Sequence, residues 1–293
     1  MKKLIAHFFL LIILVVALML FFDWIYTYTY TTANPRNKIQ YLVQLKAQKY
    51  DIIFLGSSRV ANHIDPKFFN ELSHKKTLNL GIEGAGLNDN LLELKLFLKN
   101  NNTRFVFLEI DQNLEVSTPS NFIKAQVAPY VQNEIINRHA KEHYYNSRDV
   151  GIPFYRYAIN DAEIGFREMV FLFFNVIPNF NLASGYIPKQ GHNESNISKT
   201  IMGSGKTLAN NSAFDQIKAI CKLKNIKLIL FIAPYCSKID PKEYIVKLRK
   251  TNPDLIDLSK GYDDSLFFNC NHLNEAGSKI LTKKLFEATK NRF

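Results

Sequence analysis

The chain has 293 residues, 47% of them hydrophobic, which is enough for one well-buried domain with additions or for two small domains. Its formal net charge is +11, a balance that suits nucleic acid, an anionic membrane surface or an acidic polymer. The basic residues are scattered, however, with no basic stripe interleaved with aromatic residues and no zinc-finger spacing. We therefore expect a solvated basic surface and no nucleic-acid partner.

An apolar segment lies close to the N-terminus. Residues 4–22 carry no charge and follow Lys2 and Lys3, and a helix of that length spans roughly 30 Å, the thickness of the hydrocarbon layer of a bilayer. Aromatic residues typical of a membrane interface come next, namely Trp24, Tyr26, Tyr28 and Tyr30. These features predict an N-terminal transmembrane helix with an aromatic belt over residues 1–33.

A cleavable signal peptide is the alternative, because residues 31–33 (Thr-Thr-Ala) offer a small-residue cleavage site. The apolar segment is longer than an ordinary signal core of about 7–15 residues, so we expect an uncleaved single-pass anchor. Lys2 and Lys3 then keep the N-terminus in the cytoplasm, and residues 34–293 lie on the periplasmic side of the cell membrane.

The first half of the remaining chain alternates strands and helices. Apolar runs predict strands over residues 51–55, 77–80 and 104–110, and Asp65-Pro66 is a typical helix start. A second helix is expected over residues 87–100. Three strands separated by two helices are the βαβαβ pattern of a parallel sheet.

This alternation stops between residues 115 and 205. The stretch is rich in Phe, Tyr and Asn, and helical periodicity is visible over residues 134–147 and 154–174. Because it is too long for an ordinary connection, we interpret it as a largely helical insertion or cap on the carboxyl face of the sheet.

Strands and helices return after residue 207. We expect a helix to residue 224, a strand over residues 226–233, a short strand over residues 255–258 and a last helix over residues 274–291. The fold class is therefore α/β with a parallel sheet, formed by residues 34–293 and interrupted by the insertion at about 115–205.

Two sites in this pattern could carry chemistry. The first strand runs directly into Gly56-Ser57-Ser58-Arg59, and a Ser at such a junction is either a nucleophile or the N-cap of the following helix. His272 stands at the start of the last helix, where the helix dipole favours the neutral imidazole that a general base needs. The alternative for His272 is a local structural hydrogen bond.

Taken together, these blocks resemble the SGNH (GDSL-type) hydrolase superfamily, whose four sequence blocks occur in the same order on a flavodoxin-like three-layer sandwich. Gly56-Ser57-Ser58 is similar to the family's Gly-Asp-Ser, which makes Ser58 the nucleophile and places Ser57 where the family has Asp. Gly84, after the second strand, is similar to the glycine of the second block. Asn113, after the third strand, is similar to the asparagine of the third.

The last block of the family is Asp-x-x-His, and residues 269–272 (Asn-Cys-Asn-His) resemble it with Asn269 in place of Asp. The carboxylate normally orients the His, and Asn can do so through its carbonyl oxygen. Asp263 or Asp264, slightly upstream, are alternative partners. The chain therefore either works as a Ser-His dyad oriented by Asn269 or has lost activity.

The resemblance implies acyl transfer. Ser58 would attack an ester carbonyl, His272 would take its proton, and the N–H groups of Ser58 and Gly84 with the Asn113 amide would hold the oxyanion. By similarity to envelope proteins of alginate O-acetylation and lipoteichoic acid D-alanylation, we expect an acylated glycan or ester substrate. A membrane-bound O-acyltransferase is the expected partner, with no cofactor and no metal. The alternative is a non-catalytic envelope protein on the same scaffold, which binds glycan or a membrane partner.

Two further features of the sequence could indicate a ligand site or a covalent link. Residues 203–207 (Gly-Ser-Gly-Lys-Thr) look like a phosphate-binding loop, but a Thr stands where its first Gly belongs and polar loop precedes it, so we do not expect a nucleotide site. Cys236 and Cys270 both follow predicted strand ends, and an oxidising compartment would allow them to pair. The sequence leaves that pairing open.

Overall fold

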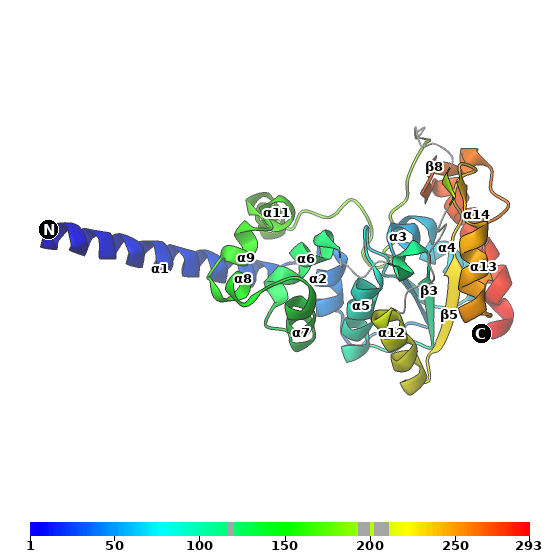
Figure 1. Ribbon diagram of the computed structural model, residues 1–293, viewed down its shortest axis with the longest axis horizontal. Coiled ribbons are helices and arrows are strands. Elements are labelled where there is room, and N and C mark those ends of the chain that lie inside the picture. Colours follow the sequence, from blue (N-terminus) through cyan, green and yellow to red (C-terminus); the bar gives the residue numbers. More distant parts are fainter. Residues whose placement is uncertain (116–119, 193–199, 202–210) are drawn as a thin grey trace. The chain divides into compact units, whose positions relative to one another are not determined.

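The computed structural model describes residues 1–115, 120–192, 200–201 and 211–293, which form two compact units (Figure 1). Residues 1–41 and 121–178 form the first, here called the helical unit, and residues 42–120 and 179–293 form the second, the sheet unit. Most of the expected insertion packs with the N-terminal helix, and only its flanks belong to the sheet unit.

A five-stranded parallel sheet is the centre of the sheet unit, with the strand order β2-β1-β3-β5-β7. Its strands are β1 (Ile52–Leu55), β2 (Thr77–Asn79), β3 (Phe105–Glu109), β5 (Lys227–Ile232) and β7 (Ile256–Asp257). Every residue of the first three strands is buried, and β1 is accordingly apolar throughout. The α/β class and the parallel sheet are confirmed.

Helices cover both faces of this sheet (Figure 1). On one face α4 (Pro66–Ser73) packs against α14 (Glu275–Thr289), and on the other α5 (Leu87–Asn100) packs against α12 (Ser212–Leu223). The short α3 (Ser58–His63) follows β1 and contacts α14. The remaining elements of this unit are α13 (Lys242–Thr251), η1 (Gln112–Leu114), η3 (Asp264–Leu266), η4 (Lys290–Arg292), the pair β4 (Thr200–Ile201) with β6 (Ile239–Asp240), and the pair β8 (Phe267–Asn269) with β9 (His272–Leu273).

An aromatic cluster fills the space between the sheet and α4. Phe54 of β1, Phe69 of α4 and Phe107 of β3 have no exposed surface, and their ring centroids lie 5.2–6.0 Å apart. Burying one such side chain contributes about 1.5–3 kcal/mol, so this cluster fixes α4 on the sheet. The start of α4 is fixed as the sequence predicts, since Asp65 accepts hydrogen bonds from the N–H groups of Lys67 and Phe68.

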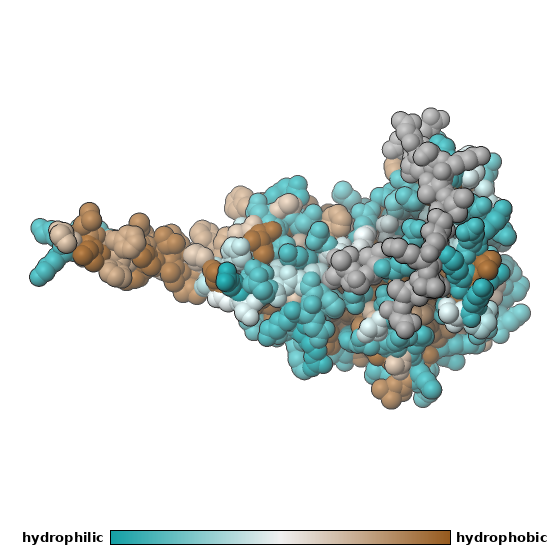
Figure 2. Space-filling model, in the orientation of Figure 1, coloured by the Kyte–Doolittle hydropathy of each residue, from teal (hydrophilic) through white to brown (hydrophobic). Residues whose placement is uncertain are grey.

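The helical unit is built around α1 (Lys2–Thr32). It also contains α6 (Asn121–Val127), η2 (Ala128–Tyr130), α7 (Glu134–His143), α8 (Ser147–Gly151), α9 (Tyr155–Ala158), α10 (Asp161–Ile164) and α11 (Phe166–Phe173), and α2 (Lys38–Gln44) begins in it. The first two thirds of α1 present exposed apolar side chains (Figure 2). By length and composition α1 can cross a membrane, a test that a signal sequence also passes.

The end of α1 is part of the core of the helical unit. Tyr26 and Tyr30 are buried, and the Tyr30 hydroxyl donates a hydrogen bond to the carbonyl of Ile164. The Tyr130 hydroxyl in turn donates to the Tyr30 carbonyl at 2.7 Å. One helix therefore has two parts, an exposed apolar part and a part packed against residues 121–178.

The helix expected over residues 154–174 is three short helices, α9 to α11. The chain turns between α10 and α11 at Gly165, which is extended (φ −77°, ψ −160°). A Cβ at Gly165 would lie 2.3 Å from the backbone carbonyl oxygen of Asp161, so this turn requires glycine. The turn could not be predicted from the sequence, because the apolar periodicity of a helix continues across Gly165.

Candidate active site

The turn after β1 delivers two serines to the carboxyl edge of the sheet. Gly56 has φ +155°, and a Cβ there would lie 2.4 Å from a methyl carbon of Val60, so glycine is required for α3 to begin so close to the strand. Ser57 is the N-cap of α3 and accepts a hydrogen bond from the Arg59 N–H at 3.3 Å. Ser58 is the first residue of the helix, and its hydroxyl is not used for capping.

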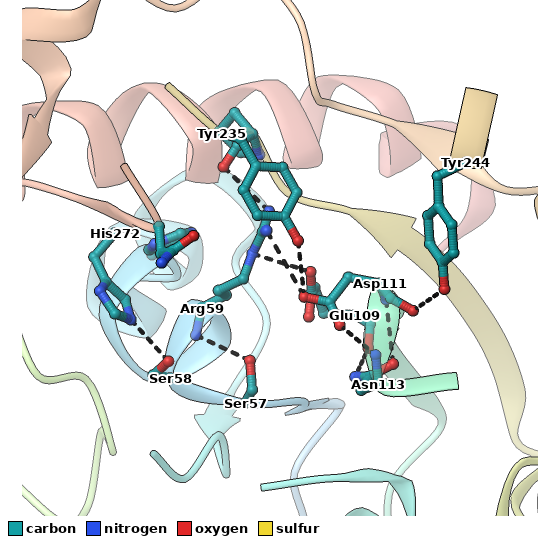
Figure 3. A network of polar contacts seen from close by, with 12 residues as sticks. Ser57, Ser58, Arg59, Glu109, Asp111, Asn113, Tyr235, Tyr244 and His272 are labelled. Carbon is teal, nitrogen blue, oxygen red and sulfur yellow. Dashed lines mark hydrogen bonds and ion pairs between the residues drawn. The ribbon is translucent and has the colours of Figure 1, made fainter. Parts of the chain in front are cut away.

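The structure brings Ser58 and His272 together across 214 residues of sequence. The Ser58 Oγ lies 2.8 Å from the His272 Nε2, and Figure 3 shows the two side chains pointing toward each other. His272 begins β9, which contacts α3. The two elements are also joined by the Leu273 N–H, which donates to the His63 Nε2 at 3.0 Å. His63 is therefore a buried structural histidine and not the partner of Ser58.

Asn269 orients the imidazole of His272. Its Oδ1 accepts hydrogen bonds at 3.0 Å from the backbone N–H groups of Asn271 and His272, which only an acceptor can satisfy, so the amide oxygen faces the loop. The same Oδ1 lies 3.0 Å from the His272 Nδ1, which must therefore carry the proton. The Nε2 is left with a free lone pair for the hydroxyl proton of Ser58.

Asp263 and Asp264 serve other contacts. Asp263 caps the short helix η3 through the Ser265 N–H. The carboxylate of Asp264 accepts hydrogen bonds from the backbone N–H and the hydroxyl of Ser237. Of the three partners considered for His272, the structure therefore places Asn269 beside the imidazole.

The surroundings of His272 favour its neutral form. Burial is the largest influence, and the positive charges of Lys189 and Arg59 add to it, so that the pKa of His272 is lowered to about 4. Lys189 belongs to residues 184–189, which run from the end of β2 to the start of α14. The Asn79 N–H donates to the Ser184 carbonyl, and the Glu275 N–H donates to the Lys189 carbonyl. The Nζ of Lys189 pairs with Glu83 at 3.1 Å.

The three expected oxyanion donors, the N–H groups of Ser58 and Gly84 and the Asn113 amide, differ in their hydrogen bonding. Within the described part of the chain, the backbone N–H groups of Ser58 and Gly84 donate to no protein acceptor. The loop that carries Gly84, where φ is +70°, is joined to the turn after β1 because the Ile82 N–H donates to the Gly56 carbonyl at 3.3 Å.

Asn113 is not brought to Ser58. Its Oδ1 accepts from the Asp111 N–H at 3.2 Å, and its Nδ2 lies 3.5 Å from the Glu109 carbonyl oxygen. The side-chain amide therefore bonds the backbone of the turn that precedes it. In Figure 3 it lies on the other side of the Arg59 and Glu109 side chains from Ser58.

Sequence reasoning missed a buried charged cluster behind the serines, which we call the Arg59 cluster (Arg59, Glu109, Asp111 and Tyr235). The Arg59 Nε lies 3.3 Å from Glu109 and its Nη1 3.7 Å from Asp111. The Arg59 guanidinium lies 3.5 Å from the ring centroid of Tyr235, whose hydroxyl donates to Asp111 at 3.0 Å (Figure 3). This cluster holds the start of α3 against the end of β3.

Burial is the largest influence on Glu109, with the charge of Asp111 next, and the pKa of Glu109 is raised to about 8. The signal in the sequence was a Glu that ends an otherwise apolar strand, because a buried carboxyl group needs a partner.

A disulfide joins two loops beside the imidazole. Cys236, which follows β5, is bonded to Cys270, which lies between Asn269 and His272. The Cys236 N–H also donates to the Cys270 carbonyl at 3.2 Å. The loop that carries the orienting amide and the base is thereby attached to the end of the sheet.

Among the described residues there is no group of three or more His, Cys, Asp or Glu side chains arranged to hold a metal ion. The segment that resembles a phosphate-binding loop, residues 203–207, lies outside the described residues.

The chain was also compared with known proteins. No protein-family model matches it, and no curated protein is similar to it at a significant level.

Proposed function

We propose that this protein is a serine acyl-transfer enzyme of the SGNH type, an O-acyltransferase or esterase. The observation that carries the proposal is the chain of contacts from the Ser58 Oγ to the His272 Nε2 at 2.8 Å and from the His272 Nδ1 to the Asn269 Oδ1 at 3.0 Å. A hydroxyl, a base and an orienting group in this order are the elements of nucleophilic catalysis.

The topology of the sheet supports the proposal. The order β2-β1-β3-β5-β7 corresponds to 2-1-3-4-5, the order of flavodoxin-like doubly wound sheets. In such sheets ligands bind outside the carboxyl ends of the strands, where the strand order reverses. Ser58 follows β1, which lies at that reversal between β2 and β3.

The proposed reaction begins when the Ser58 oxygen attacks the carbonyl carbon of an ester and its proton passes to the His272 Nε2. The bond between the carbonyl carbon and the ester oxygen then breaks, and the leaving alcohol takes the proton from His272. Water or an acceptor hydroxyl attacks the acyl-serine by the same steps in reverse, which regenerates Ser58.

The oxyanion of each tetrahedral intermediate would be held by the N–H groups of Ser58 and Gly84, neither of which donates to an acceptor in the described part of the chain. One donor of this kind typically contributes roughly 3 kcal/mol to lowering the barrier. We do not include Asn113, since its amide bonds the backbone of residues 109 and 111.

We place the enzyme at the cell membrane, with α1 as an uncleaved anchor and the remaining chain on the periplasmic side. Cleavage after residues 31–33 would remove Tyr26 and Tyr30 from the core of the helical unit, which favours a retained helix. The disulfide suits an oxidising compartment. An acylated cell-envelope glycan is the proposed substrate, and a membrane-bound O-acyltransferase is the proposed partner.

A fluorophosphonate probe tests the proposal on the full-length protein, because it labels only an activated serine. We expect labelling of the wild-type protein and of Ser57→Ala, and none of Ser58→Ala or His272→Ala. Ser57→Ala is the control, because it removes the neighbouring hydroxyl from the same turn. Loss of labelling in Ser58→Ala alone therefore shows loss of the nucleophile and not a disturbance of the turn. If the folded wild-type protein is not labelled, the enzyme proposal is wrong and the alternative stands, a non-catalytic envelope protein that binds glycan or a membrane partner.

A further inference from the structure

The exposed apolar side chains of the helical unit are not confined to α1. In residues 151–155 (Gly-Ile-Pro-Phe-Tyr), between α8 and α9, Ile152 is 41% and Tyr155 is 39% exposed, and we call this segment the interfacial turn. Ile159, one turn further on, is 40% exposed. Exposed apolar groups that cluster in this way mark an interaction surface.

The interfacial turn is fixed at the point where the apolar part of α1 ends. The Phe154 ring centroid lies 5.7 Å from that of Phe22 and 5.0 Å from that of Tyr26. The Phe154 N–H donates to the Asp23 carboxylate at 2.7 Å. The turn therefore lies at the same level along α1 as residues 22–26.

An ion pair between Asp23 and Arg156 lowers the cost of placing this part of α1 against lipid. Asp23 is the first charged residue after the apolar part of α1. Its carboxylate accepts hydrogen bonds from both Nη atoms of Arg156, at 2.5 and 2.9 Å. A carboxylate at the edge of the hydrocarbon layer is costly unless it is paired, and the bidentate arginine neutralises it.

The backbone of the turn is held in a strained conformation. Phe154 has φ +64°, a left-handed conformation that bulky residues rarely adopt. In this conformation its ring contacts α1 and its N–H reaches Asp23. Strain of this kind persists where surrounding contacts impose it, often at functional segments.

We propose that the interfacial turn inserts into the headgroup region of a lipid bilayer, next to the point where α1 leaves the hydrocarbon layer. The helical unit is then held at the membrane by a second contact besides the spanning helix. Trp24 and Tyr28, which are 60% and 57% exposed and whose rings stack 5.8 Å apart, complete the interfacial surface. This inference rests on the membrane anchor of the proposed function and not on its chemistry.

Another exposed apolar position of the helical unit provides the control. Ile177 is 84% exposed, but the carbonyl of its neighbour Val176 accepts from Arg36, which lies beyond the end of α1. Tyr30, still within α1, is already about 10 Å along the helix axis from Asp23. Ile177 is therefore expected outside the bilayer, although its side chain is more exposed than those of Tyr155 and Ile159.

The test uses full-length protein in nanodiscs of phosphatidylcholine, with and without brominated acyl chains that quench tryptophan. Trp24 is the one tryptophan in the sequence, so the wild-type protein reports on the anchor. In a Trp24→Phe background, Tyr155→Trp and Ile159→Trp report on the interfacial turn, and Ile177→Trp is the matched control.

We expect brominated lipid to quench the wild-type protein and the Tyr155→Trp and Ile159→Trp variants, with blue-shifted emission, and to leave Ile177→Trp unquenched. If the wild-type protein is quenched and Tyr155→Trp and Ile159→Trp are not, the proposal that the interfacial turn inserts is wrong, and the anchor is unaffected. Absence of quenching in the wild-type protein would overturn the anchor itself, and the interfacial turn with it.

Discussion

Ser57 and Ser58 are adjacent hydroxyls with different surroundings. Ser57 accepts a backbone hydrogen bond at the start of α3, whereas the Ser58 hydroxyl contacts an imidazole. The sequence left a nucleophile and a helix cap as alternatives for this turn. In the structure Ser57 is the cap, and Ser58 is left as the nucleophile of the proposed reaction.

Ser57→Ala is expected to lower stability but keep labelling, and Ser58→Ala is expected to keep stability but lose labelling. Ser57→Ala removes the cap and should lower the free energy of unfolding by about 1 kcal/mol. Ser58→Ala should change that free energy little, because the hydroxyl supports no backbone group. Urea denaturation of the two variants measures the difference. An equal loss for both would contradict the separation of roles.

Asn269 is a neutral orienting group, where the proposed family has a charged Asp. Asn269→Leu removes the acceptor for the Nδ1 proton of His272 and should reduce the acylation rate by up to about 10⁴-fold, as the wrong tautomer does in a Ser-His-Asp triad. Asn269→Asp keeps the hydrogen bonds and adds a charge, so it should raise the pKa of His272. Burst kinetics with an activated ester compare the two variants. Full activity of Asn269→Leu would show that the amide does not orient the base.

The low pKa of His272 sets the pH range of the proposed reaction. The base must be neutral, so the rate is constant well above pH 4 and falls as the pH drops through about 4, below the usual histidine value near 6.5. The pH dependence of the acylation rate measures this. Lys189→Ala should move the acid limb upward, because Lys189 is the first of the charges that lower this pKa. An acid limb at the same pH in Lys189→Ala and in the wild-type protein would show that Lys189 does not lower the pKa of His272.

At the scale of elements, the disulfide links the end of β5 to the loop that carries Asn269 and His272. It closes a sequence separation of 34 residues, and a bridge of this kind typically stabilises a protein by about 2–4 kcal/mol. Cys236→Ser with Cys270→Ser should lower the denaturation midpoint and slow acylation, since the base is less well placed. Cys221→Ser, which touches neither loop, is the control. Unchanged acylation in the double variant would show that the bridge has no positioning role.

The order of the sheet elements could be predicted from the sequence because each strand carries its own signal. Residues 52–55 and 105–108 are buried on both faces, so they are apolar without interruption. The helix over residues 87–100 was predicted to the residue, as a clear amphipathic period. The two-unit division was not predictable, since it depends on contacts such as Tyr130 with Tyr30 that join distant segments.

The site was predictable to the extent that its members lie at strand ends. The carboxyl ends of parallel strands meet at one edge, which brings Ser58 toward the loops of the later strands. The position of Asn113 was not predictable, because a turn of its own backbone competes for the amide. The Arg59 cluster was missed because no local pattern joins Arg59 to Tyr235, a contact made through the fold.

At the scale of the whole molecule, α1 has an exposed apolar part and a part that packs in the core of the helical unit. Deletion of residues 1–22 keeps Tyr26 and Tyr30 and should leave the helical unit folded. Deletion of residues 1–33 removes both, and the helices of residues 121–178 should then lose protection. Hydrogen exchange measures protection there, with the sheet unit as internal reference. Equal protection after both deletions would show that the end of α1 is dispensable for folding.

The cysteine arrangement has a practical consequence for chemical labelling. The sequence has three cysteines, of which Cys236 and Cys270 are bonded to each other and Cys221 is only 2% exposed. Burial also raises the pKa of Cys221 to about 12, so its thiolate form is scarce at neutral pH. The native protein therefore offers maleimide reagents no reactive thiol. A single cysteine added at any exposed position becomes a unique attachment point for dyes, cross-linkers or spin labels, without removal of the native three.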